Sequence, residues 1–136
     1  MKILTKEKYK ELDETNRDKN GWLDLSNYDC SEIKEFGYGI TFGNNITFGD
    51  FIKFGSYIII EGEYKLISYL KFGGFGSRNY SDTYIYNCEE GIYVRCGCFF
   101  GSMEEFIKRV KDEKGDIFYI DICGLSVKKF KHQNPS

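Results

Sequence analysis

The residues that could support catalysis are few, and their positions argue against an enzyme. The sequence contains one histidine, His132, in the closing segment KFKHQNPS. A histidine that acts as a general base must be held beside its substrate, and we expect this segment to be a tail outside any repeat. Histidine-dependent acyl transfer and hydrolysis are therefore not expected.

The other nucleophiles and metal ligands are five cysteines: Cys30, Cys88, Cys96, Cys98 and Cys123. Cys96 and Cys98 would share one face of a strand, but zinc sites prefer a gap of two to four residues and a second ligand pair. Arg95 would point to the opposite face of that strand, so it would not lower a thiol pKa. We therefore expect buried, reduced cysteines, no metal, no cofactor and no enzymatic activity.

The best candidate for a ligand site is a glycine-rich segment, GGFGSR, which ends at Arg78. Gly76 and Ser77 would offer a backbone N–H and a hydroxyl to an anion, and Arg78 would offer its guanidinium. Tyr80 and Tyr84 follow closely enough to stack on a base. The alternative is a structural loop in which Arg78 bonds a carbonyl or a carboxylate. The sequence leaves both interpretations open.

The fold that positions these candidate residues is dominated by a six-residue repeat. Phe-Gly recurs every six residues, and an aliphatic column follows at the same interval; the rings are Phe36, Phe42, Phe48 and Phe54, and the first aliphatics are Ile40, Ile46, Ile52 and Ile58. Six residues match an α-helix poorly, and a meander of hairpins would need unusually short strands. The repeat favours a parallel β-helix in which three hexads close one triangular coil. Rings would fill the interior, and glycine would occupy the bends.

Two outer faces of this expected coil carry aromatic or aliphatic side chains, which a partner normally covers. The predicted interface residues are Phe51, Lys53, Tyr57, Ile59, Tyr69 and Lys71. A closed trimer, in which one face of each subunit meets a different face of its neighbour, would cover both faces. Alternatively, terminal segments of the same chain cover them. We therefore expect a homo-oligomer, with a trimer favoured.

The length of 136 residues suits a single domain. We expect an N-terminal helix and cap in 1–35, the hexad β-helix in 36–76, and a hairpin, a helix and a C-terminal segment in 77–136. The fold class is then mainly β, with one or two short helices: a short left-handed parallel β-helix of about two coils, capped by a β-hairpin and an α-helix. Residues 117–130 are compatible with either a strand or a helix.

The order of these segments resembles a family of small phage and prophage proteins that contain hexapeptide repeats. The motifs that carry the resemblance are GSR, ending at Arg78, and GCFFGSMEEF, from Gly97 to Phe106, in which Ser102 and Glu105 form an expected capping box. The resemblance implies a left-handed β-helix of the hexapeptide type. The sequence departs from the family pattern in two places. The inward column holds Phe rather than Ile or Val, and the segment KGDIFYIDICG is less helical than its counterpart in the family.

Composition limits the class of partner. A net charge of −2 and a pI of about 5.5 make nucleic acid an unlikely ligand, and no apolar run is long enough to span a membrane. We expect a non-enzymatic phage or prophage protein in the cytoplasm of a bacterial host. It would bind a host protein or sequester a small nucleotide-like anion, as an anti-defence factor. The alternatives are an assembly protein that only self-associates and an atypical hexapeptide transferase.

Overall fold

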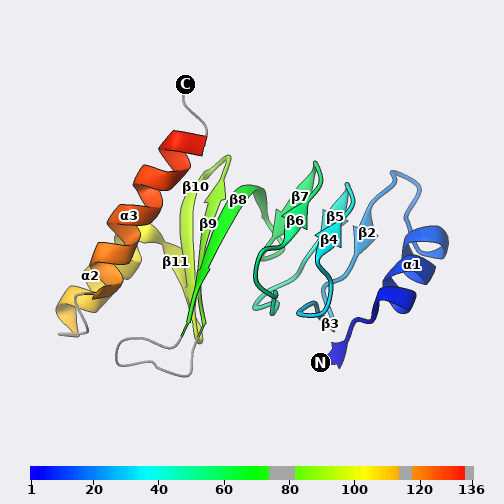
Figure 1. The fold of residues 1–136 in the computed structure, drawn as a ribbon, viewed down its shortest axis with the longest axis horizontal. Coiled ribbons are helices and arrows are strands. Elements are labelled where there is room, and N and C mark those ends of the chain that lie inside the picture. Colours follow the sequence, from blue (N-terminus) through cyan, green and yellow to red (C-terminus); the bar gives the residue numbers. More distant parts are fainter. Residues whose placement is uncertain (74–81, 114–117, 134–136) are drawn as a thin grey trace. The chain divides into compact units, whose positions relative to one another are not determined.

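The structure is a computed structural model that describes residues 1–73, 82–113 and 118–133 (Figure 1). The chain forms two compact units, Met1–Leu66 and Ile67–Ser136. The boundary between these units falls inside one strand, β8 (Tyr64–Phe72).

The first unit combines one helix with short strands. Helix α1 (Lys6–Thr15) begins at Thr5, whose hydroxyl accepts a hydrogen bond from the Lys8 N–H at 3.1 Å, and it buries Leu12. The strands have two or three residues each: β1 (Lys2–Ile3), β2 (Leu23–Asp24), β3 (Tyr28–Asp29), β4 (Glu35–Phe36), β5 (Ile40–Thr41), β6 (Lys53–Phe54) and β7 (Ile58–Ile60).

The strands of the hexad region pair in parallel at a regular interval, which the pairs β1 with β3 and β2 with β5 do not share. Strand β4 pairs with β6, β5 pairs with β7, and Cys30 forms a bridge with Phe48. Three such pairs have partners 18 residues apart: Glu35 with Lys53, Ile40 with Ile58, and Cys30 with Phe48. Three consecutive hexads therefore separate one strand from the strand beside it, which is the interval that the sequence repeat predicts.

The phenylalanine column lies in the interior of this unit. Phe36, Phe42 and Phe48 are buried, with at most 2% of each side chain exposed. Together with Phe54 their ring centroids are 4.9 to 6.3 Å apart, mostly in edge-to-face contact. This arrangement is the favoured one for aromatic pairs, and it explains why a large ring recurs at every sixth position.

The prediction that the glycines of the Phe-Gly pairs occupy the bends is wrong. None of these glycines has a positive φ; the left-handed positions at this spacing are Gly39, Asn45, Phe51 and Tyr57. Close packing explains the glycines instead. A Cβ on Gly49 would lie 2.6 Å from the Ser31 carbonyl oxygen, and one on Gly55 would lie 2.7 Å from the Gly37 carbonyl oxygen. Glycine lets neighbouring turns of the chain approach each other.

The predicted fold class, a left-handed parallel β-helix, is also wrong. After β7 the chain reverses at Glu61 and Gly62, which have φ values of 50° and 74°, and β8 pairs antiparallel with β7. The hydrogen-bonding order of strands is β11-β10-β9-β8-β7-β5-β2, a mixed seven-stranded sheet. The nine residues of β8 form one long strand, so no third turn of hexads begins.

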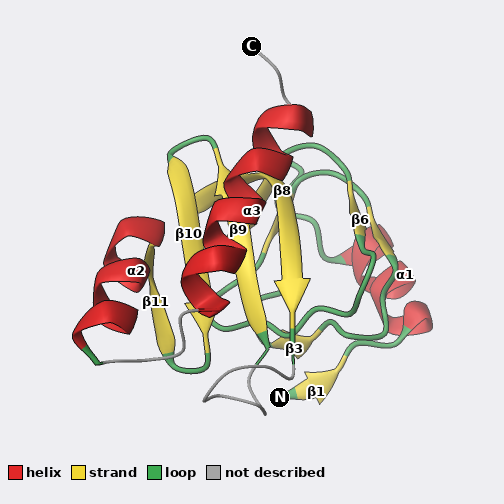
Figure 2. Ribbon diagram, turned by 60° about the vertical axis from the view of Figure 1, so that its left-hand side comes forward, coloured by secondary structure: helices red, strands yellow, loops and turns green. Residues whose placement is uncertain are grey.

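The second unit packs two helices on a sheet. Strands β9 (Thr83–Cys88), β10 (Gly91–Cys96) and β11 (Phe99–Ser102) pair in antiparallel order beside β8. Helices α2 (Met103–Asp112) and α3 (Phe118–Gln133) lie on the same face of this sheet (Figures 1 and 2). Residues 118–130 of the ambiguous C-terminal segment are thus helical. The capping box of Ser102 and Glu105 is confirmed, with hydrogen bonds of 3.1 and 3.2 Å.

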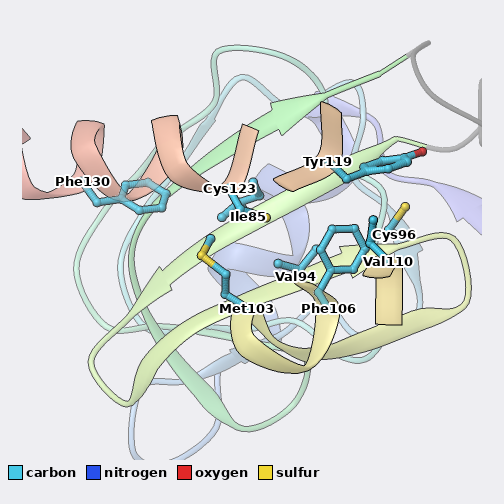
Figure 3. Packing of buried hydrophobic residues seen from close by; sticks show 9 residues of the cluster. All are labelled: Ile85, Val94, Cys96, Met103, Phe106, Val110, Tyr119, Cys123 and Phe130. Atoms are coloured by element: carbon cyan, nitrogen blue, oxygen red, sulfur yellow. The ribbon is translucent and has the colours of Figure 1, made fainter. Parts of the chain in front are cut away.

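The core of the second unit lies between these helices and the strands. Figure 3 shows Met103, Phe106 and Val110 of α2 facing Tyr119 and Cys123 of α3. The cluster is completed by Ile85, Val94, Cys96 and Phe130. Apolar residues of α2 and α3 therefore close the core on one face of the sheet.

We expect alanine at Gly49 to destabilise the protein, whereas alanine at Gly37 should not. At Gly49 the new Cβ would lie 2.6 Å from a backbone oxygen, but at Gly37 its nearest neighbour is the Tyr9 hydroxyl at 3.6 Å. Overpacking of this kind costs about 1–3 kcal/mol, and relief of glycine entropy contributes roughly 0.4–1 kcal/mol in the opposite direction. Urea denaturation of both variants measures the difference, and equal stabilities would contradict the packing argument.

Candidate functional site

One surface of the first unit is built by two parallel strands in register. We call it the β4–β6 face, and it consists of Glu35, Gly37 and Tyr38 beside Lys53, Gly55 and Ser56. Side chains alternate along a strand, so Phe36 and Phe54 point into the core while the named residues are exposed. A hollow of about 600 Å³ lies over this face.

The hollow exists because both outward positions at its centre are glycine. Gly55 must be glycine, since a Cβ there would lie 2.7 Å from the Gly37 carbonyl oxygen. Gly37 has no such restriction, because its φ is not positive and its nearest neighbour would be the Tyr9 hydroxyl at 3.6 Å. Packing within the chain therefore does not explain why residue 37 lacks a side chain.

Tyr9 of α1, and Arg17 just after this helix, hold the edge of the face in place. The Tyr9 hydroxyl accepts a hydrogen bond from the Gly37 N–H at 2.8 Å, and burial raises the pKa of this phenol. Arg17 places its guanidinium carbon 5.1 Å from the centre of the Tyr38 ring, and it also donates to the Gly39 carbonyl at 3.2 Å. Asp13 pairs with Arg17 at 2.7 Å. Tyr38 is thus held at the surface, with 65% of it exposed.

Two further aromatic residues beside this face occupy unfavourable backbone positions. Phe51 and Tyr57 have φ values of 56° and 61°, yet 97% and 74% of these residues are exposed. A left-handed conformation costs a bulky residue about 1–2 kcal/mol. The equivalent positions six residues apart hold Gly39 and Asn45, the residue types that adopt this conformation readily. Neither backbone geometry nor burial accounts for rings at 51 and 57.

The face also carries two opposite charges that form no salt bridge with any residue that the structure describes. Glu35 and Lys53 are direct neighbours across β4 and β6, and both are exposed. Within the described residues neither side chain forms a salt bridge, although Arg17 and Lys71 elsewhere in the chain do. A carboxylate and an ammonium group are therefore available side by side for an external partner.

The six predicted interface residues lie on different elements of the two units. Phe51, Lys53 and Tyr57 belong to the exposed region around β6. Ile59 is half-buried and pairs with Lys65 of β8. Tyr69 and Lys71 lie half-buried on β8 in the second unit, where the Lys71 ammonium is 3.4 Å from Asp82. The assumed stacking of residues 69 and 71 over 51 and 53 fails because the chain reverses after β7.

Most of the predicted ligand loop lies outside the described residues. This applies to Gly76, Ser77, Arg78 and Tyr80, so the anion site at these positions stays a prediction. Tyr84 is described: only 5% of it is exposed, and its ring stacks on Tyr86 with centroids 5.9 Å apart. Such burial does not suit a residue that stacks on a base.

The cysteines include one exposed residue, Cys98, and four buried ones. Burial raises the pKa of Cys30 and Cys88 to about 12 and that of Cys123 to about 11. These thiols are protonated at neutral pH and are poor nucleophiles. In residues 1–73, 82–113 and 118–133 no group of three His, Cys, Asp or Glu residues could hold a metal ion.

Sequence reasoning missed five of the six residues of the β4–β6 face, all except Lys53. Glu35, Gly37, Tyr38, Gly55 and Ser56 were not expected to form a site. A signal was nevertheless present, because Phe36-Gly37 and Phe54-Gly55 are 18 residues apart. Stacking the repeat at that interval places the two glycines side by side and so predicts a gap between their neighbours.

Comparison of the chain with protein-family models, with curated proteins and with solved structures gives no match. No helix in the described parts of the chain is long and apolar enough to cross a membrane.

Proposed function

We propose that this chain is a non-enzymatic binding protein that contacts a partner protein through the β4–β6 face and the neighbouring rings of Phe51 and Tyr57. The observation that carries the proposal is the exposure of these two rings at left-handed positions. Each residue has an unfavourable backbone conformation and exposes its apolar ring to water. Strained, exposed residues of this kind are typical of functional sites, and aromatic anchors dominate the binding energy of protein interfaces.

The resemblance to phage and prophage proteins suggests the kind of partner. A protein of the bacterial host fits a phage-encoded factor that blocks host defence, and this would act in the host cytoplasm. Self-association in an assembly role is the second candidate. It is supported by the adjacent, opposite charges of Glu35 and Lys53, which a second copy can pair.

We expect the double substitution Phe51→Asn and Tyr57→Asn to weaken partner binding strongly without destabilising the protein. Asparagine tolerates the left-handed conformation, as Asn45 does with a φ of 57°, so the free energy of unfolding should stay constant or rise by about 1–2 kcal/mol. Loss of two anchors should weaken binding at least about 30-fold, which corresponds to roughly 2 kcal/mol.

The measurement is affinity capture from host extract, with the partner identified by mass spectrometry and its Kd determined by calorimetry for each variant. Phe118→Asn is the matched control, because Phe118 is an exposed aromatic residue of α3, 60% accessible and remote in sequence. It should bind like the wild type. Unchanged affinity of the double variant for every captured protein and for a second copy would refute the proposal.

A further inference from the structure

We infer that the β4–β6 face binds the same face of a second copy of this chain, so that the protein forms a dimer with two-fold symmetry. This inference rests on the proposed function, because it names one partner of the surface proposed there.

The register makes the face self-complementary. Glu35 lies opposite Lys53 and Phe36 opposite Phe54, and continuing the same register places Gly37 beside Gly55 and Tyr38 beside Ser56. Consider a two-fold axis that runs parallel to the strands, above the face and over the midline between β4 and β6. This axis places β4 of one copy opposite β6 of the other. Each Glu35 then faces Lys53 of the second copy, and each Gly37 faces Gly55.

Charge complementarity favours this arrangement over an unrelated partner. Both ion pairs form at once across the axis, since the carboxylate and the ammonium group are neighbours on one face and neither has a salt-bridge partner among the described residues. A shift by one row along the strands would instead place Glu35 of one copy opposite Gly55 and its Lys53 opposite Gly37, so neither ion pair would form. Complementary charges of this kind fix the register of an interface.

The two glycines allow the copies to approach. Two sheets with full side chains pack about 10 Å apart, whereas a row of glycines permits a closer approach and contact between the flanking Tyr38 and Ser56 rows. This gives Gly37 a role that packing within one chain does not provide, because a Cβ there would meet nothing closer than 3.6 Å.

The test mixes two charge-reversed proteins. Glu35→Lys presents two positive charges on the face, and Lys53→Glu presents two negative charges, so each variant should repel its own copies. An equimolar mixture should form a heterodimer, because each lysine at 35 or 53 then faces a glutamate. Light scattering coupled to size exclusion should give a monomer near 15.9 kDa for each variant alone and about twice that mass for the mixture.

The expected changes are at least a tenfold rise in the dimer Kd for each single variant and recovery of the wild-type Kd in the mixture. Glu63→Lys is the matched control, since Glu63 is exposed in the turn after β7 and its reversal should leave the dimer intact. The mixing design matters because a pair formed within one chain would not be restored by mixing separate chains.

A wild-type protein that stays monomeric up to millimolar concentration, or a mixture of folded variants that stays monomeric, overturns the dimer. Neither result touches the proposed function, which loss of a host partner in the Phe51→Asn/Tyr57→Asn variant tests separately. If a charge variant fails to fold, cross-linking decides instead. Tyr38→Cys mixed with Ser56→Cys, both in a Cys98→Ser background, should give a covalent dimer on oxidation, and its absence overturns the inference.

Discussion

Replacing Phe42 by alanine should lower the free energy of unfolding by about 3–5 kcal/mol. The Phe42 side chain is 0% exposed, and its ring centroid lies 5.1 Å from that of Phe36 and 4.9 Å from that of Phe48. The truncation removes a ring from the centre of the phenylalanine column, and the other rings cannot fill the space, because each is fixed by its own strand or bend. Urea denaturation followed by circular dichroism measures the loss.

The same truncation at Phe51 is the matched control. That residue is 97% exposed, and alanine is no better suited to a left-handed position than phenylalanine, so the change should stay within about 0.5 kcal/mol. Equal effects at the two positions would show that the hexad rings do not form the core. The comparison thus separates the rings that support the fold from the rings that we assign to binding.

Raising the pH from 9 to 11 should destabilise the protein steeply. Burial raises the pKa of Cys30 and Cys88 from 9.0 to about 12 and that of Cys123 from 9.0 to about 11. Above pH 9 the unfolded chain therefore releases protons that the folded chain keeps, so stability is complete below pH 9 and is lost as the pH rises toward the folded values. Each thiol contributes up to about 1.4 kcal/mol per pH unit in this range.

With all three thiols, we expect the free energy of unfolding to fall by about 4 kcal/mol per pH unit near pH 10. Denaturation at several pH values, in the presence of a reductant, measures it. A variant with Cys30→Ala, Cys88→Ala and Cys123→Ala should be less stable at pH 7 but should lose most of this slope. The buried phenol of Tyr9 acts in the same direction, because its pKa is also raised. A flat profile for the wild type would show that these thiols are accessible to water.

Local signals in the sequence predicted several elements correctly. The helix α2 and its capping box follow from Ser102 and Glu105, because a cap depends on residues three apart. The inward phenylalanine column follows from the six-residue interval, which is also visible in the parallel register of β4 with β6. The hairpin of β9 and β10 follows from two β-rich runs around a turn.

The chain reversal after β7 could not be predicted from local preference. It depends on a left-handed Glu61 with a φ of 50°, a conformation that glutamate rarely adopts. The buried side chain of Glu61 accepts hydrogen bonds from the Asn45 N–H at 3.2 and 3.3 Å. A contact between residues 16 apart therefore stabilises the turn, and it ends the parallel pairing that the hexads suggested.

The backbone strain at the candidate site could not be predicted, for a related reason. Residue type argues against a left-handed backbone at Phe51 and Tyr57, so the sequence suggested ordinary outward positions of a β-helix face. Only the backbone geometry shows that these rings are strained as well as exposed. The Glu35 and Lys53 pair follows from the same 18-residue stacking that places Gly37 beside Gly55, and the register of β4 and β6 shows it.

The left-handed positions at 51 and 57 also have a consequence for protein engineering. A campaign that selects variants for heat resistance would favour asparagine or glycine at both positions, as already present at Asn45 and Gly39. Such variants would survive the selection while losing the rings by which we propose the protein meets its partners. Thermostabilised versions made for crystallography should therefore keep Phe51 and Tyr57 unchanged.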